Sequence, residues 1–397
     1  MAAAFISSAQ KKPLKSSASF ELGSGLNFQF NDSAYQFTIG GMVQPYIGMN
    51  TIGEADPDYY FNSRRSYFNL GGAAIKEKVS FFVQLDFSST DPLLDAWIGL
   101  HPTQNLNIYI GQKQNIANNR EMLLMETHLQ YPGRSLVSSE FSRSGREMGI
   151  FADYRIGIKK VGIIPQLAIT SGDGRNSFGT DSRDIDLGGF KYAARLDVYP
   201  LGFFSKGNDK SIGDLVHEES LKFVIGAAAS YNDGASDAVG EGHGNFALFD
   251  IDGSAMQPDY RQLYGDILMK YRGFSFLGEY VVATATQLEG IYTSPTASDA
   301  LLPAEISEYL ALGTGYNVQA GYVLPSKNYG IDARYFGLMP EFDQNAGSLT
   351  QEQSGWSLGV SKYFIGNACK LQAAYTSLSS PTLPESNQIE ILFQVVF

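Results

Sequence analysis

The sequence predicts an all-β fold: a closed antiparallel transmembrane β-barrel of about sixteen strands, with long extracellular loops and short periplasmic turns. Composition is the first observation, because 18% of the 397 residues are charged, below the roughly 25% typical of soluble domains, and 42 are Gly. The second is a series of segments, each about ten residues long, in which apolar and polar residues alternate. The third is that the links between these segments alternate between short and long.

Composition also excludes several classes of protein. No run approaches the ~18 consecutive apolar residues of a membrane-spanning helix, so a helical transporter is excluded. The one cysteine, Cys369, cannot form an intramolecular disulfide and is interpreted as a packing residue. A net charge of -12 argues against nucleic acid as a partner.

The N-terminal residues are expected to precede the barrel, which is expected to occupy residues 35–397. Residues 1–9 contain the small residues of a secretory cleavage site but lack a basic start, and we interpret them as a signal-peptide remnant whose true start lies further upstream. The alternative is a frayed terminus. Residues 10–34 are rich in Lys, Ser and Gly, which indicates a flexible periplasmic lead.

Sixteen segments carry the period-two alternation of a strand with one polar and one apolar face. In one of them, for example, Val79, Phe81 and Val83 alternate with Ser80 and Gln84. The expected strands lie near 35–50, 62–75, 78–88, 92–100, 105–113, 146–156, 160–171, 188–199, 221–231, 260–272, 273–285, 314–324, 328–338, 354–365, 368–378 and 387–397. An even number is typical of bacterial outer-membrane barrels.

The last strand runs to the end of the sequence. Ile389, Ile391, Phe393, Val395 and Phe397 alternate with mostly polar residues, so the terminus is expected to be held in a sheet. It resembles the C-terminal strand, ending in Phe, by which outer-membrane barrels are recognised by their assembly machinery.

The links are sorted by length. Short turns at 76–77, 157–159, 272–273, 325–327 and 366–367 alternate with long links at 114–145, 172–187, 232–259 and 286–313. Barrels with periplasmic termini show this pattern, with the long loops outside the cell. The link 200–220 breaks it, since a short turn is expected there, and indicates either a further feature that the pattern does not show or a periplasmic elaboration.

Charged residues fall mostly on the expected inward face. A charge on the lipid face costs roughly 2 to 4 kcal/mol at the membrane midplane, which accounts for the sorting. The inward set is Arg65, Asp86, Asp95, Lys191, Arg195, Asp197, Lys222, Asp266, Lys270, Arg272, Asp332, Arg334, Lys370 and Glu390. Side chains cannot fill the lumen of a barrel this wide, so either an aqueous channel or folded-in loops are expected.

Several motifs carry a family resemblance. They are Arg64–Gly72 (RRSYFNLGG), Val83–Phe87 (VQLDF), Asp95–Leu100 (DAWIGL), Ile110–Lys113 (IGQK), and the run through Glu121, Arg134–Leu136 and Gly145–Gly149. Over residues 35–170 these resemble the porin O/P family of phosphate-selective porins, which are sixteen-stranded and commonly trimeric. The resemblance implies passive uptake of phosphate or similar small anions across the outer membrane, with lipid as the surroundings and a homotrimer or an outer-membrane protein complex as the assembly.

The link 114–145 occupies the position of the loop that narrows sixteen-stranded porins, and is expected to be the constriction loop. Its neighbourhood is slightly basic in an acidic chain, and cations in a constriction select anions. The candidate pore-lining and anion-binding residues are Lys113, Arg120, Arg134, Arg143 and Arg146. The alternative is that each Arg pairs with a nearby Glu and only fixes the loop. Inward acidic residues are as common as basic ones, which departs from a phosphate-selective pattern.

Other functions have less support in the sequence. The four His lie in links or at strand ends without the spacing of a catalytic triad, so an enzyme is not expected. No cofactor is expected, and no metal site, because the short Asp-rich turn at 250–253 lacks the full calcium-loop pattern. The alternative function is a non-conducting or plugged barrel that serves as a structural or docking subunit of an outer-membrane complex.

Overall fold

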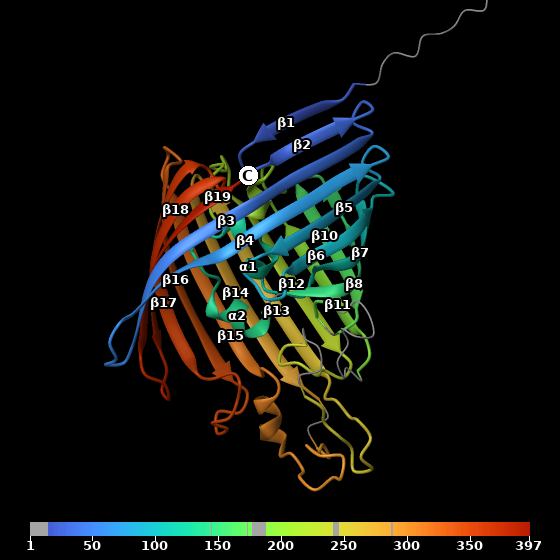
Figure 1. Cartoon of the computed structure of the whole chain (residues 1–397), viewed down its shortest axis with the longest axis vertical. Coiled ribbons are helices and arrows are strands. Elements are labelled where there is room, and N and C mark those ends of the chain that lie inside the picture. Colours follow the sequence, from blue (N-terminus) through green and yellow to red (C-terminus); the bar gives the residue numbers. More distant parts are fainter. Residues whose placement is uncertain (1–14, 144, 173, 177–187, 241–245, 287–288) are drawn as a thin grey trace, which may run out of the picture.

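The computed structural model describes residues 15–143, 145–172, 174–176, 188–240, 246–286 and 289–397. A closed antiparallel barrel of sixteen strands forms the body of the protein (Figure 1). Its strands are β3 (Tyr35–Ile52), β4 (Asp58–Ala74), β5 (Val79–Asp86), β6 (Leu93–Leu100), β7 (Leu106–Gln114), β8 (Arg146–Tyr154) with its continuation β9 (Ile156–Ile158), β10 (Val161–Thr170), β11 (Lys191–Tyr199), β12 (Lys222–Asn232), β13 (Tyr260–Tyr271), β14 (Phe274–Ala285), β15 (Gly313–Val323), β16 (Tyr329–Pro340), β17 (Gln353–Ile365), β18 (Cys369–Ser379) and β19 (Ser386–Val396). All sixteen expected strands are present, so the predicted fold is confirmed.

The barrel closes where the last strand meets the first. β19 pairs antiparallel with β3, from Ser386 opposite Ile52 to Val396 opposite Met42. The expectation that the C-terminus is held in a sheet is therefore correct. The backbone of Phe397 also exchanges hydrogen bonds with Gly41, which ties the terminal residue to β3.

The N-terminal lead is more ordered than expected. β1 (Ser17–Glu21) and β2 (Gly25–Phe30) form a hairpin, and β2 pairs with the first residues of β3. Its turn needs positive φ at Gly23 and Gly25, which glycine adopts without steric cost. The expectation of a flexible segment over 10–34 is thus wrong for residues 17–30. Residues 1–9, interpreted as a signal-peptide remnant, lie outside the described residues.

The outer surface carries an apolar belt, as a barrel in lipid requires. Large apolar side chains that are well exposed occur on most strands, among them Ile98, Ile150, Leu167, Ile225, Leu263, Tyr280, Ile331, Leu358 and Phe393. The charged residues Lys191, Arg195, Asp266, Lys270 and Lys370 are buried inside instead. In the described part of the chain, no helix reaches the length and hydropathy needed to cross a membrane.

The link 200–220 is a folded element at the end that carries the short turns. It contains the short helix η3 (Asn208–Lys210) and a network around two buried carboxylates, Asp214 and Glu218. Asp214 accepts from the backbone N of Gly273 at 2.8 Å, and Lys270 Nζ donates to the carbonyl oxygen of Ser211 at 2.6 Å. The link 200–220 is therefore a compact folded segment that is hydrogen-bonded to the inner wall, where a short turn was expected.

Candidate constriction of the lumen

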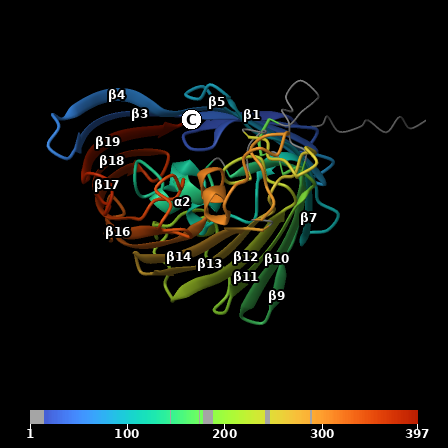
Figure 2. The ribbon, with the colours of Figure 1, turned by 90° about the horizontal axis from the view of Figure 1, so that it is seen from below.

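The segment 115–143, called here the constriction segment, folds into the barrel. It contains α1 (Arg120–Leu123), η1 (Glu126–His128) and α2 (Leu136–Phe141), and α2 lies within the ring of strands when the barrel is viewed along its axis (Figure 2). The side chain of Ser135 caps α2 by accepting from the backbone N of Ser138. Most residues of the segment are buried, as they lie inside the barrel.

One wall holds the segment through a buried charge network. Arg120 Nη2 lies 2.6 Å from Asp197 Oδ1 on β11, and its Nε lies 2.6 Å from Asp266 Oδ1 on β13. Arg195 bonds to the same two carboxylates at 3.0 and 2.5 Å. Gly226 on β12 leaves room for both guanidinium groups, since a Cβ there would lie 2.4 Å from Arg195 and 2.5 Å from Arg120. Two cations and two carboxylates thus neutralise each other.

A second carboxylate organises the segment from within. Glu121 accepts from the backbone N of Ser135 at 2.7 Å and from Ser138 Oγ at 2.6 Å, and it meets Arg334 Nη1 of β16 at 3.1 Å. Burial opposes its ionisation, but Arg334 and Arg134 dominate and lower the pKa of Glu121. Glu121 therefore stays ionised and joins the two helices to the wall.

The other wall holds the segment by its backbone carbonyls. Lys370 Nζ on β18 donates to the carbonyl oxygen of Leu129 at 2.6 Å, and Gln394 on β19 donates to that of Thr127 at 3.0 Å. Tyr131 OH donates to the carbonyl oxygen of Ser357 at 3.3 Å. The segment is tethered on both sides and crosses the lumen.

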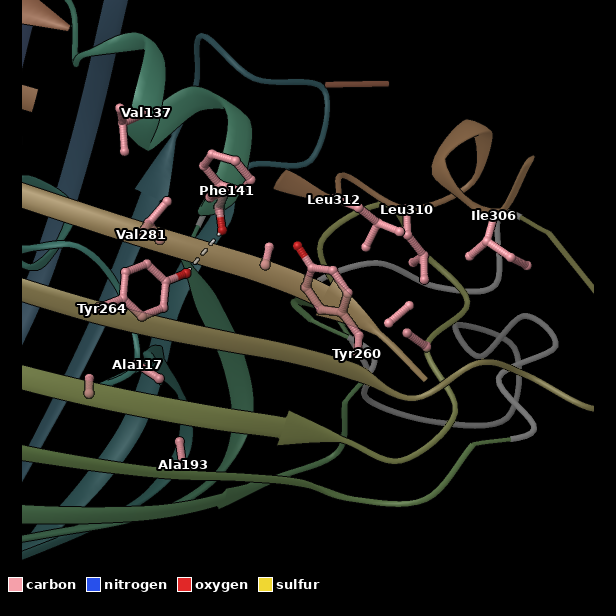
Figure 3. Close-up of a cluster of buried hydrophobic side chains, with 14 of the residues drawn as sticks. Ala117, Val137, Phe141, Ala193, Tyr260, Tyr264, Val281, Ile306, Leu310 and Leu312 are labelled. Carbon is pink, nitrogen blue, oxygen red and sulfur yellow. Dashed lines mark hydrogen bonds between the residues drawn. The ribbon is translucent and has the colours of Figure 1, made fainter. Parts of the chain in front are cut away.

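Two hydrophobic clusters extend this filling along the barrel axis. The first joins Val137 and Phe141 of the constriction segment to Tyr264 and Val281 of the wall, and continues to the apolar residues of the long link before β15 (Figure 3). Tyr264 OH donates to the carbonyl oxygen of Phe141 at 3.2 Å, the bond drawn as a dashed line in Figure 3. The second cluster joins Leu124 to Phe204 and Ile212 of the link 200–220, with Val224, Leu268 and Leu277 from the wall.

A polar cavity of about 180 Å³ remains beside β16–β19 and β4. Its charged lining residues are Arg64, Arg134, Arg334 and Glu390. Arg64 pairs with Glu390, while Arg134 Nη2 lies 2.9 Å from Glu126 Oε1. Although burial opposes the ionisation of Glu126, Arg134 and Arg146 lower its pKa. Three guanidinium groups therefore face the cavity with one carboxylate in its lining.

The five residues predicted as pore-lining occupy different places. Arg134 lines the cavity, whereas Arg120 is buried in the network with Asp197 and Asp266. Arg146 is buried and pairs with Asp95 at 3.0 Å. Arg143 has a half-exposed side chain that lies 3.6 Å from Asp237, and Lys113 Nζ lies 5.0 Å from the ring centroid of Tyr109. Each of the four arginines thus has a carboxylate within 4.0 Å, but only Arg134 and Arg146 pair with a Glu of the segment, Glu126, whereas Arg120 and Arg143 pair with Asp residues from other parts of the chain.

Arg64 and Arg334, which line the cavity, are not among the residues predicted to line the pore. Arg334 was on the expected inward face and Arg64 within a family motif, but nothing in a strand pattern gives the height of a side chain along the barrel. Within the described ranges, no group of three or more His, Cys, Asp or Glu residues is arranged to hold a metal ion.

No protein-family model matches this chain, and no curated protein matches it. The likeness is to solved structures of outer-membrane barrels. The outer-membrane channel DcaP of Acinetobacter baumannii aligns with a TM-score of 0.55 and 9% identity over 92% of this chain and 98% of its own. OprB of Pseudomonas putida gives 0.55 and 10% over 91% and 94%, and the outer-membrane protein OmpT of Vibrio cholerae gives 0.53 and 10% over 92% and 98%.

At such identities the likeness shows the fold, and the porin O/P family is not confirmed. The shared architecture and the apolar belt place this protein in the outer membrane, as a sixteen-stranded barrel of the kind found in outer-membrane channels.

Proposed function

We propose that this protein is a narrow outer-membrane channel for the passive diffusion of small anions, phosphate among them. The cavity beside β16–β19 carries the proposal, because Arg64, Arg134 and Arg334 line it with Glu390 as the one carboxylate in its lining. Guanidinium groups offer donors that replace the hydration shell of an anion, and a low-dielectric wall strengthens their field. The hydrophobic clusters pack mainly against β10–β14, which favours a path on the side of this cavity.

The pairing of each arginine shapes the expected selectivity. Glu121 pairs with Arg334, and Glu126 pairs with Arg134. Neither carboxylate lines the cavity, whereas both arginines do. Partial neutralisation predicts a weak preference for anions over cations rather than tight binding of one anion. The small volume predicts low conductance.

Planar-bilayer recording tests this function. The reconstituted barrel is expected to give small stable current steps and a reversal potential biased toward chloride across a KCl gradient. Arg64→Gln removes a cation whose side chain is 27% exposed in the cavity, and is expected to shift the reversal potential toward cations. Arg143→Gln is the control, because Arg143 is half-exposed and is not among the residues that line the cavity. Equal shifts in both variants contradict the proposed path.

A plugged barrel that acts as a docking subunit is the second candidate. It is favoured by the burial of inner-wall side chains around residues 127–131: Gln44 is 1% exposed, and Lys370 and Gln394 are 0% exposed. A barrel that is closed around residues 127–131 is expected to conduct no current even when it is correctly folded. As a docking subunit, it is expected to copurify with its partners. Silence in the bilayer, from protein whose folding has been verified, selects this candidate.

The assembly proposed for either function is an oligomer of this chain, built on the wall formed by β4–β7. Residues 58–63 of β4 extend beyond β5, which pairs with β4 over Tyr67–Ala74. Tyr59 and Phe61 are 70% and 79% exposed on this extension. A strand of the length of β5 rises about 26 Å and covers about 20 Å of membrane when tilted, less than the roughly 25 Å apolar band. A second copy covers this short wall, and OmpT of V. cholerae has been solved in a trimer form.

A further inference from the structure

The end of the barrel with the short turns carries two adjoining grooves, one on each side of Phe203. One, of about 440 Å³, is lined by Arg155, Lys206 and Lys210, together with Asp209. The other, of about 660 Å³, is lined by Lys159, Lys160 and Lys222. Six cations and one carboxylate thus line a continuous region in a chain of net charge -12.

The fold of the link 200–220 removes two carboxylates from this surface. By sequence the link is acidic, with Asp209, Asp214, Glu218 and Glu219 against two lysines. In the structure Asp214 and Glu218 turn inward and are buried, where they accept hydrogen bonds from backbone amides and Asn208. Lys206 and Lys210 stay on the outside. Two of the four carboxylates are thus used inside, while Asp209, Glu219 and both lysines stay exposed.

The grooves are held in place by packing rather than by ion pairs. Arg155 Cζ lies 3.5 Å from the ring centroid of Phe203, and Gly162 lies against the same ring, since a Cβ at Gly162 would meet it at 2.5 Å. Lys222 Nζ donates to the carbonyl oxygen of Leu201 at 2.7 Å. The lining cations of both grooves are absent from the twelve ion pairs within 4.0 Å that the described residues form.

We propose that these two grooves form a binding site for a multivalent anion, a polyphosphate or polycarboxylate, at the periplasmic mouth of the barrel. The cations come from four places, so an extended anion can contact both grooves at once: the junction of β8 and β9 (Arg155), the turn before β10 (Lys159 and Lys160), the link 200–220 (Lys206 and Lys210) and the start of β12 (Lys222). Binding relies on several exposed charges acting together, so it is strongest at low salt and weakens as ionic strength rises. The site is separate from the cavity beside β16–β19 and does not depend on conduction.

Calorimetric titration of the folded barrel in neutral detergent, at low salt, tests the site with tripolyphosphate and with citrate. The double variant Lys160→Gln/Lys210→Gln removes one exposed lysine from each groove, and is expected to weaken binding about tenfold. Lys76→Gln/Lys78→Gln is the matched control, because these exposed lysines lie in the turn between β4 and β5 and should leave affinity unchanged. All four positions are exposed in turns or in the link, and heat modifiability on gels verifies folding of each variant.

The outcomes separate clearly. Binding that weakens in the groove variant alone supports the site, and binding of only one of the two anions restricts it to that chemistry. Absence of binding by both anions to the folded wild type, or an equal loss in both double variants, overturns the proposal. Current through the barrel is not measured in this experiment, so its failure leaves the proposed channel function standing.

Discussion

Arg120 Nε lies 2.6 Å from Asp266 Oδ1, although 146 residues separate the two in the chain. One belongs to the constriction segment and the other to β13, and both are buried. This contact and the pairs formed by Asp197 and Arg195 attach the constriction segment to the inner wall of the barrel. The rigidity of the lumen therefore depends on a buried charge network, and breaking one member has a predictable cost.

Arg120→Ala is expected to destabilise the barrel by about 3 kcal/mol, because removing one partner leaves buried carboxylates with too few counter-charges. The midpoint of thermal unfolding, read from heat modifiability on gels, should fall. Released from its tether, the constriction segment should also give larger and noisier currents. Arg143→Ala is the control, since that side chain is half-exposed and lies 3.6 Å from its carboxylate, and it should change stability by less than about 0.5 kcal/mol. Equal losses in both variants contradict the role of the network.

Gly226→Ala tests whether the wall is shaped to receive the two guanidinium groups. The added Cβ would lie 2.4 Å from Arg195 and 2.5 Å from Arg120, which neither pinned side chain can accept without losing a bond. A loss of about 1 to 3 kcal/mol is expected from overpacking. Gly265→Ala on the neighbouring strand is the matched control, because a Cβ there meets nothing within 4 Å. The measurement is the midpoint of thermal unfolding of both variants. An equal fall in the midpoint for the Gly265 and Gly226 variants contradicts the role of Gly226 in making room for the two guanidinium groups.

The sequence predicted the barrel well because a strand in lipid must alternate, and alternation is visible locally. The sixteen strands and the inward charges such as Asp266 and Lys370 follow from period-two patterns. The entry of the segment 114–145 was expected only from its position, which is that of the constricting loop in sixteen-stranded porins. The position of a side chain along the barrel axis cannot be predicted from the residues next to it in the sequence. Nothing near Arg120 shows that it meets β11 and β13, and nothing near Arg64 shows that it reaches the same cavity as Arg334. Net charge by segment was also misleading, because two of the four carboxylates of the link 200–220, Asp214 and Glu218, fold inward while its two lysines stay exposed.

His128 gives the protein a predicted pH dependence. Burial, and then the nearby cations Lys370, Lys210 and Lys270, lower the pKa of His128 to about 4. The unfolded chain takes up this proton near pH 6.5 and the folded chain only near pH 4, so the unfolded state binds more protons between these values. Stability from this group is complete above about pH 6.5 and decreases as pH falls toward 4, by about 3 kcal/mol.

His128→Gln should therefore flatten the fall in unfolding midpoint between pH 7 and pH 4 relative to the wild type. Gln keeps a hydrogen-bonding side chain beside Thr127, whose Oγ1 lies 2.7 Å from His128 Nδ1. His101→Gln is the control, since His101 lies next to β6 and bonds to Ser80 and Asn107. A wild-type slope retained in the His128 variant shows that carboxylates alone set the pH dependence.

The exposed extension of β4 predicts how copies of the chain associate. Tyr59 and Phe61 point away from the barrel on residues that have no strand partner on the β5 side among the described pairings. Burying two such aromatic side chains contributes several kcal/mol to an interface. The double variant Tyr59→Ser/Phe61→Ser is therefore expected to convert an oligomer into a monomer, as measured by light scattering of the detergent-solubilised protein after correction for bound detergent. Phe364→Ser, an outward residue of β17 that is 55% exposed, should leave the oligomer intact because it faces lipid on another part of the wall. A wild type that is already monomeric contradicts the proposed oligomer, and an oligomer lost only in the Phe364 variant places the contact elsewhere.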